Sequence, residues 1–258
     1  MKRILLFCAV IFCFAYVQAQ TDSVQTEGEF ADTLLQERAF RPRQLVAPVV
    51  LIGLGAWGLA ENSPVDILAH KARNDMNPNW HKCHADEVLQ YTPSGVHLVL
   101  GFIPGVKAKH NFLDRAIASA TAHALTVATT KGIKNVVHEK RPDSSKENSF
   151  FSGHTATAFT GAELVRIEYG WGYGSAAYAM AITTGFLRVY NKRHWVGDVL
   201  AGAGTGILCA NAGYWMLPVW KRWFRLDKKK KGSTPTLVAT PFYQQEDKAA
   251  GLSCSILL

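Results

Sequence analysis

Uncharged, largely apolar stretches recur along the middle of the chain and predict a set of helices. They cover residues 44–60, 88–106, 116–130, 155–165, 173–187 and 199–220, and Glu163 is the one charged residue inside them. Most are shorter than the roughly 20 residues that a membrane-spanning helix needs, and 199–220 is the convincing exception. Their number, more than the length of any one stretch, favours a helical domain that meets a membrane.

The N-terminus has the pattern of an export signal. Lys2 and Arg3 precede an apolar run at 4–17, which ends in small and polar residues around Ala19. This order predicts a signal peptide at 1–19 with cleavage after Ala19. A retained membrane anchor is the alternative, because the run is long for a signal core. Both readings send the chain into the export pathway.

Three further segments follow the signal. Residues 20–43 are polar and lack periodicity, so they are interpreted as a flexible arm. Residues 44–220 hold the recurrent stretches and are interpreted as one helical domain. Residues 221–258 form a basic segment and a tail; from residue 234 the tail has the composition of extended chain.

Composition and charge exclude several classes of protein. Hydrophobic residues make up 48% of the 258 positions and charged residues 19%, between the values typical of soluble and membrane proteins. The net charge of +8 would suit nucleic acid, but the lysine run 228–231 follows an apolar stretch, where basic residues mark the cytoplasmic side of a membrane. Outside the signal, Cys83, Cys209 and Cys254 are too far apart for a zinc site or a disulfide framework. We therefore expect no nucleic acid and no metal.

The charged connections predict an orientation. If 107–115 and 221–231 are cytoplasmic, then 131–154 and 188–198 lie together on the opposite, periplasmic side of a bacterial inner membrane. A cleaved signal followed by a spanning 44–60 would reverse this arrangement. We therefore expect 44–60 to lie partly in the membrane interface.

Three short motifs carry the candidate chemistry. They are Lys134-x6-Arg141-Pro142, Ser152-Gly153-His154 and Arg188-x5-His194-x3-Asp198. Each alone is common at helix ends and turns. Together they combine three cations, a helix start and a histidine beside a carboxylate, which are the parts that phosphoryl transfer needs.

The cations and the helix start suit a bound phosphate. Lys134, Arg141 and Arg188 can neutralise phosphate oxygens, a task that metal ions perform in other phosphoryl-transfer enzymes. Ser152 and Gly153 precede an apolar helix, so a hydroxyl and free backbone N–H groups can meet the same oxygens. The sequence thus predicts a phosphate site without a metal or other cofactor.

The two histidines are assigned different roles. His194 and Asp198 are spaced i, i+4, which predicts one helix face on which the carboxylate orients the ring and leaves the other nitrogen free to attack. His154 has no carboxylate at that spacing, so it is the candidate acid for the leaving group. Arg188 would lie on the opposite side of a continuous helix, which predicts a bend at 191–193.

This three-part pattern resembles the signature of type 2 phosphatidic acid phosphatases, which share their site with vanadium haloperoxidases. The resemblance covers about 44–220 and matches every charged and imidazole position, whereas Phe151 replaces the usual Pro and Leu187 the usual Ser. It implies an all-α, membrane-embedded bundle of about six helices with its site at the periplasmic surface.

The same resemblance implies residue roles. The histidine matching His194 becomes phosphorylated, the aspartate matching Asp198 orients it, and the histidine matching His154 is the general acid. The positions of Lys134, Arg141, Arg188, Ser152 and Gly153 bind phosphate.

The expected function is metal-independent hydrolysis of a phosphomonoester or pyrophosphate on a membrane lipid, through phosphohistidine. Relatives act on phosphatidate, phosphatidylglycerophosphate, undecaprenyl pyrophosphate and lipid A, and we favour lipid A. A periplasmic non-specific acid phosphatase is the first alternative. A haloperoxidase holding vanadate is disfavoured by the uncharged helices, and an inactive scaffold by the complete motifs. The expected partners are a phosphorylated lipid and the membrane.

Overall fold

A computed structural model describes residues 42–75, 83–224, 236–244 and 249–257. The predicted signal and most of the predicted arm therefore lie outside the described residues. The elements are η1 (Pro42–Leu45), α2 (Val46–Trp57), α3 (Pro64–Asp75), α4 (Ala85–Leu89), α5 (Thr92–Val99), η2 (Leu100–Phe102), α6 (Phe112–Val136), α7 (Gly153–Tyr169), α8 (Trp171–Tyr190), α9 (Val196–Trp215), α10 (Leu217–Trp223), β1 (Thr236–Gln244) and β2 (Ala249–Leu257).

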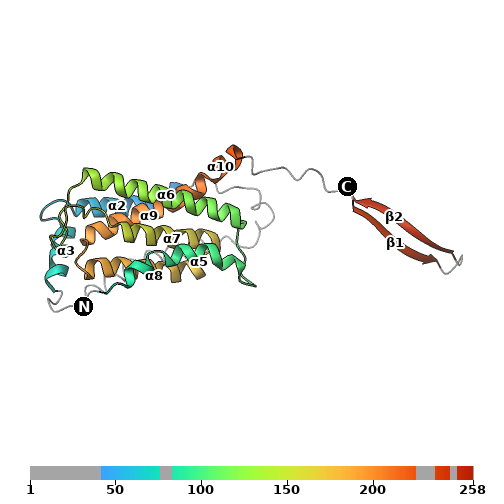
Figure 1. Ribbon diagram of the computed structural model, residues 1–258, viewed down its shortest axis with the longest axis horizontal. Coiled ribbons are helices and arrows are strands. Elements are labelled where there is room, and N and C mark those ends of the chain that lie inside the picture. Colours follow the sequence, from blue (N-terminus) through green and yellow to red (C-terminus); the bar gives the residue numbers. More distant parts are fainter. Residues whose placement is uncertain (1–41, 76–82, 225–235, 245–248, 258) are drawn as a thin grey trace. The chain divides into compact units, whose positions relative to one another are not determined.

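The chain divides into two compact units, one ending at Pro218 and the other beginning at Val219. The first unit is a helical bundle (Figure 1). The second contains an antiparallel hairpin in which Thr236 pairs with Leu257 and Gln244 with Ala249. The predicted all-α fold is thus confirmed for the first unit, and the extended tail takes the form of this hairpin.

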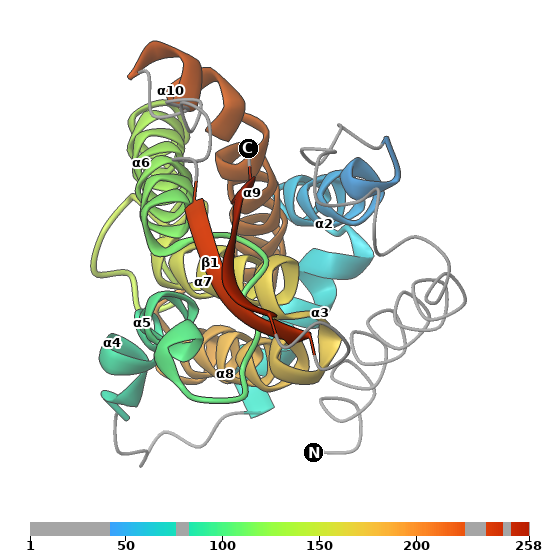
Figure 2. The same ribbon diagram turned by 90° about the vertical axis from the view of Figure 1, so that its right-hand side faces the viewer.

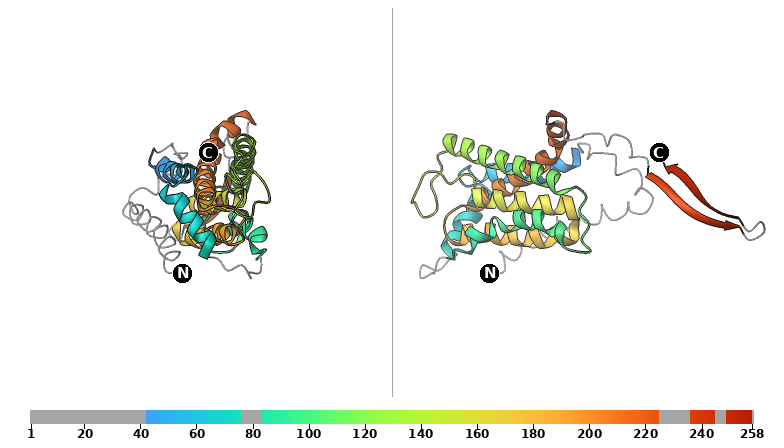
Figure 3. Two further views of the ribbon diagram at one scale, coloured as in Figure 1. Left: turned by 90° about the vertical axis from the view of Figure 1, so that its left-hand side faces the viewer. Right: turned by 45° about the vertical axis from the view of Figure 1, so that its right-hand side comes forward.

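Helices α7 and α9 pack against each other at the centre of the bundle. Helices α5 and α8 lie against α7, while α2 and α6 lie against α9 (Figure 2). The long helices α6, α7 and α8 run nearly along one direction (Figure 3). The buried core of α7 is mostly small and aliphatic, and it includes Ala158, Ala162 and Val165.

Small residues let the central helices approach closely. A Cβ atom at Gly206 of α9 would lie 2.3 Å from the Ala156 carbonyl oxygen of α7, and one at Gly202 would lie 2.7 Å from the Ser152 carbonyl oxygen. A side chain at either position would push the two helices apart. The glycines of α9 therefore set the distance between the elements that carry the second and third motifs.

The helices agree with the apolar pattern, with differences at their ends. The stretches 116–130, 155–165 and 173–187 lie inside α6, α7 and α8, and 199–220 is divided between α9 and α10. Helix α3 was not predicted, because its sequence carries charges throughout. Among the described residues, no helix has both the length and the apolar composition of a membrane span.

Candidate active site

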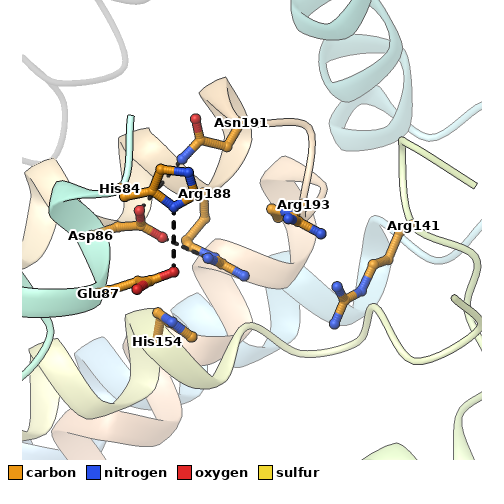
Figure 4. Close-up of a pocket in the computed structure, with 8 residues that line it drawn as sticks. All are labelled: His84, Asp86, Glu87, Arg141, His154, Arg188, Asn191 and Arg193. Atoms are coloured by element: carbon orange, nitrogen blue, oxygen red, sulfur yellow. Dashed lines mark hydrogen bonds and ion pairs between the residues drawn. The ribbon is translucent and has the colours of Figure 1, made fainter. Parts of the chain in front are cut away.

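One pocket of about 250 Å³ gathers residues from all three motifs (Figure 4). The side chains of His154, Arg188 and Arg141 converge on it from α7, α8 and the loop after α6. Its full lining is His84, Asp86, Glu87, Arg141, His154, Arg188, Asn191 and Arg193. Three guanidinium groups and two imidazoles thus line one small space, together with two carboxylates.

The second motif forms the start of α7. Ser152 is the N-cap residue: its Oγ accepts hydrogen bonds from the backbone N–H of Thr155 at 3.5 Å and from the Thr155 hydroxyl at 2.9 Å. Ser152 is fully buried and does not line the pocket. Its side chain therefore fixes the helix start, where first-turn N–H groups lack helical acceptors and favour an anion. Gly153 is the first residue of α7, and the side chain of the next residue, His154, lines the pocket.

Arg188, in the last turn of α8, is held by a residue outside the motifs. Its Nη1 donates to Asp86 Oδ2 at 2.5 Å, and both residues are buried. Asn191 Nδ2 lies 3.4 Å from Asp86 Oδ1 and donates to the Cys83 carbonyl at 2.7 Å. This network ties α4 to the end of α8 and restrains the guanidinium at the pocket wall.

The predicted bend between Arg188 and His194 is present. Helix α8 ends at Tyr190, and Lys192 adopts a positive φ of 55°. The backbone N–H groups of Arg193 and His194 both donate to the Arg188 carbonyl, at 3.0 and 3.3 Å. The turn thus brings His194 back beside the end of α8.

The predicted helix face for His194 and Asp198 is wrong, although the contact between them exists. His194 precedes α9, whose N-cap is Trp195, and Asp198 lies in the first turn. Asp198 Oδ2 accepts from the backbone N–H of Trp195 at 2.9 Å and lies 3.4 Å from His194 Nδ1. The hydroxyl of Ser149 also donates to this oxygen. A helix cap, not a shared helix face, brings the pair together.

The His194 environment favours a neutral ring. Burial lowers the pKa of His194, although Asp198 opposes this by a hydrogen bond and by its charge. Because Nδ1 faces Asp198, the lone pair for attack would be on Nε2. His194 is 2% exposed and does not itself line the pocket.

The other two cations differ in their surroundings. Lys134, at the end of α6, donates from Nζ to the Asn148 carbonyl at 2.8 Å, and burial followed by the charge of Arg141 lowers its pKa to about 8. It does not line the pocket. Arg141 does, and its buried Nε has no hydrogen-bond partner among the described residues. Burial, then Arg188, lowers the pKa of Arg141, so a bound anion would relieve a local excess of positive charge.

His154 is neutral at pH 7 in this arrangement. Burial, and then the charge of Arg188, lowers its pKa to about 4. An anion between His154 and Arg188 would reverse the second effect and favour the protonated ring. The proton needed by a general acid therefore depends on what occupies the pocket.

Sequence reasoning missed Asp86 and Ser149, because these residues meet the motifs through long-range contacts that spacing does not encode; Asn191 was interpreted only as part of the bend. Arg193 was visible between Arg188 and His194 and was interpreted only as part of the bend. The described residues contain no group of three or more His, Cys, Asp or Glu side chains arranged to hold a metal ion.

Comparisons with known proteins agree with the motifs. The PAP2 superfamily model matches residues 115–222, which include all three motifs. The "Lipid A 1-phosphatase" of Porphyromonas gingivalis is 37% identical over 164 residues, covering 59% of this chain and 36% of that protein. The chain thus matches little more than a third of this relative's length.

Two solved structures resemble the fold at low identity. A crystal structure of Aquifex aeolicus LpxE gives a TM-score of 0.46 at 22% identity, covering 60% of this chain and 97% of that one. The first transmembrane PAP2 type phosphatidylglycerolphosphate phosphatase from Bacillus subtilis gives 0.39 at 18% identity, with coverages of 73% and 98%.

Proposed function

We propose that the chain is a member of the PAP2 superfamily, whose model matches residues 115–222, and that it hydrolyses a phosphate ester or pyrophosphate on a membrane lipid through phosphohistidine at His194. One observation carries the proposal: Arg141, His154 and Arg188 line one pocket, and the backbone N–H of His194 donates to the carbonyl of Arg188. In this proposal the two arginines bind the anion, His154 is the acid and His194 is the nucleophile.

In the first step the phosphoryl group binds between Arg141 and Arg188, with the start of α7 as a further donor. His194 Nε2 attacks phosphorus, and the bond from phosphorus to the lipid oxygen breaks. The leaving oxygen takes a proton from His154, whose pKa the bound phosphate raises. Asp198 stabilises the positive charge that develops on the His194 ring.

In the second step water attacks the phosphohistidine. His154 accepts the proton from this water, the bond between phosphorus and Nε2 breaks, and inorganic phosphate leaves. His194 is then neutral again, and His154 is protonated as in the substrate complex and loses this proton to solvent once phosphate has left. The positive charge that other phosphoryl-transfer enzymes take from metal ions comes here from Lys134, Arg141 and Arg188.

Two features support a lipid as the substrate. Helix α4 supplies Asp86 and Glu87 to the pocket, while Val88 and the following Tyr91 are 72% and 62% exposed. Exposed apolar side chains beside a polar pocket suit a ligand with a charged headgroup and an apolar body. The similarity to a lipid A 1-phosphatase makes lipid A the first candidate. The charge pattern supports an inner-membrane location with the site facing the periplasm.

The test is mass spectrometry of membrane lipids from cells with and without the protein. We expect a lipid species lighter by one phosphate when the wild-type protein is present and not when His194→Ala replaces it. The purified protein should release phosphate from the same lipid in detergent with EDTA. Equal efficiency on a water-soluble aryl phosphate would favour a non-specific acid phosphatase instead.

A further inference from the structure

A second cavity, of about 360 Å³, reaches Asp198 and shares no lining residue with the first. Its polar wall contains Glu61, Asp66, His70, Glu139, Lys140 and Asp198. The mechanism above uses only Asp198 among these residues. Three further carboxyl groups of this cavity, those of Glu61, Asp66 and Glu139, have no role in that mechanism.

The two carboxylate oxygens of Asp198 are in different situations. Oδ2 is well supplied, with donors from the Trp195 backbone and the Ser149 hydroxyl and with His194 Nδ1 at 3.4 Å. Oδ1 is buried and has no hydrogen-bond partner among the described residues. An ionised oxygen left in this state is costly, so a donor is expected at Oδ1.

Glu139 is the residue placed to supply it. Its carboxyl group lines the same cavity, and its own Oε2 is likewise buried without a partner in the described part of the chain. Its carbonyl accepts from the backbone N–H of Ser149 at 2.9 Å, the residue whose hydroxyl holds Asp198. Two carboxyl groups in one buried space cannot both be ionised cheaply, and a shared proton would satisfy both vacant oxygens.

The pKa shifts of the two carboxyl groups indicate that Glu139 carries the shared proton. Burial, and then Asp198, raise the pKa of Glu139 to about 9, and Asp66 adds to the effect. The pKa of Asp198 is instead lowered: burial opposes this, and the hydrogen bond from His194 is the largest favourable contribution. Glu139 is therefore a neutral acid at pH 7, facing an ionised Asp198.

The other charged groups around the cavity are paired with each other, paired outside the cavity, or exposed. From α3, His70 Nε2 lies 3.2 Å from Asp66 Oδ1. In the loop that carries Glu139, Lys140 Nζ lies 3.5 Å from Glu147 Oε1. Glu61, before α3, is exposed. Glu139 Oε2 and Asp198 Oδ1 are therefore the best candidates to share a hydrogen bond.

We propose that Glu139 is a positioning residue that carries a proton and donates it in a hydrogen bond to Asp198 Oδ1. This contact keeps Asp198 ionised and its Oδ2 turned toward His194. The inference rests on the proposed function, because it assigns Glu139 a role in activating His194 for phosphoryl transfer.

Three variants separate this role from a structural one. Glu139→Gln keeps a neutral donor, Glu139→Leu removes it at similar volume, and Glu61→Gln removes an exposed carboxylate that lines the same cavity. At pH 7 we expect Glu139→Gln to stay near the wild-type kcat and Glu139→Leu to lose roughly 10- to 100-fold, the range for losing a hydrogen bond to a charged group.

The pH profile is the decisive readout. Above pH 9 the wild-type Glu139 loses its proton and faces Asp198 as a like charge, whereas glutamine cannot. The ratio of kcat for Glu139→Gln to that for wild type should therefore rise above pH 9, and the ratio for Glu61→Gln should stay flat. This comparison remains valid if Glu139→Leu fails to fold.

Two failures can be told apart. Wild-type protein that is inactive, or as active as His194→Ala, overturns the proposed function. Active wild-type protein with a flat Glu139→Gln ratio, or with Glu139→Gln as impaired as Glu139→Leu, overturns the role of Glu139 alone.

Discussion

Arg188 and Asp86 form a buried ion pair, with Nη1 of one 2.5 Å from Oδ2 of the other, although 102 positions separate them in the chain. The carboxylate fixes one side of the guanidinium, and the buried Nε of Arg188 has no partner among the described residues. An arginine held in this way is pre-organised for an anion at its remaining donors.

We predict that Asp86→Asn lowers kcat/KM roughly 10- to 100-fold, because the loss of a charged hydrogen-bond partner frees the guanidinium. Glu87→Gln is the matched control, since it removes the same charge from the same pocket without releasing Arg188. Steady-state kinetics on one phosphate ester would compare them. Equal effects would mean that only the pocket's net charge matters.

Replacing Arg141 or Arg188 by lysine should lower kcat/KM at least about tenfold, because lysine keeps the charge but not the planar fork. Arg43→Lys in η1, outside the pocket, should have no such effect. The three variants can be assayed side by side. Wild-type rates for both pocket variants would mean that neither arginine needs its planar fork to bind phosphate.

The lowered pKa of His154 predicts a pH-dependent stability. Its folded pKa of about 4 lies below the unfolded value of 6.5, so the unfolded state binds more protons between these limits. This contribution to stability is present above pH 6.5 and is lost as pH falls toward 4. The free energy of unfolding, from urea titrations at pH 6.5 and 4.5, should therefore fall less in His154→Ala than in wild type. An identical fall would contradict the desolvated environment of this ring.

Replacing glycine by alanine should have opposite effects on stability at two helical positions, one at the close approach of α7 and α9 and one in open space. Gly206→Ala places a Cβ against the Ala156 carbonyl and should destabilise the bundle by about 1–3 kcal/mol. Gly132→Ala in α6 meets nothing within 4 Å and should stabilise by about 0.5–1 kcal/mol. Denaturant titrations give both values. Equal effects would show that α9 does not need its glycine here.

The spacing of the motifs predicted which residues share the pocket better than it predicted the local backbone around them. The motifs named His154, Arg141 and Arg188, which share the pocket, and the bend before His194 followed from helical periodicity. The prediction that His194 and Asp198 lie on one helix was wrong, because α9 begins after His194 and the Asp198 side chain caps it from the first turn. A spacing of i, i+4 cannot distinguish this cap from a continuous helix.

The supporting residues could not be predicted in this way. Asp86 and Glu139 meet Arg188 and Asp198 only after distant segments pack together, and neither occupies a position in the motif pattern. Ser152 was expected to meet phosphate, but its hydroxyl serves as the N-cap of α7. Local sequence therefore predicted which candidate groups line the pocket, whereas tertiary packing determines what holds them.

We propose that the reaction is metal-independent and passes through phosphohistidine at His194. The most direct measurement is mass spectrometry of peptides from protein treated with an aryl phosphate in EDTA and quenched in base. His154→Ala should accumulate the modification, because a good leaving group needs no acid whereas hydrolysis of the intermediate needs a base. We predict base-stable, acid-labile phosphate on His194 and none in His194→Ala. Phosphate on another residue, or activity lost in EDTA and restored by magnesium or zinc, would contradict the account.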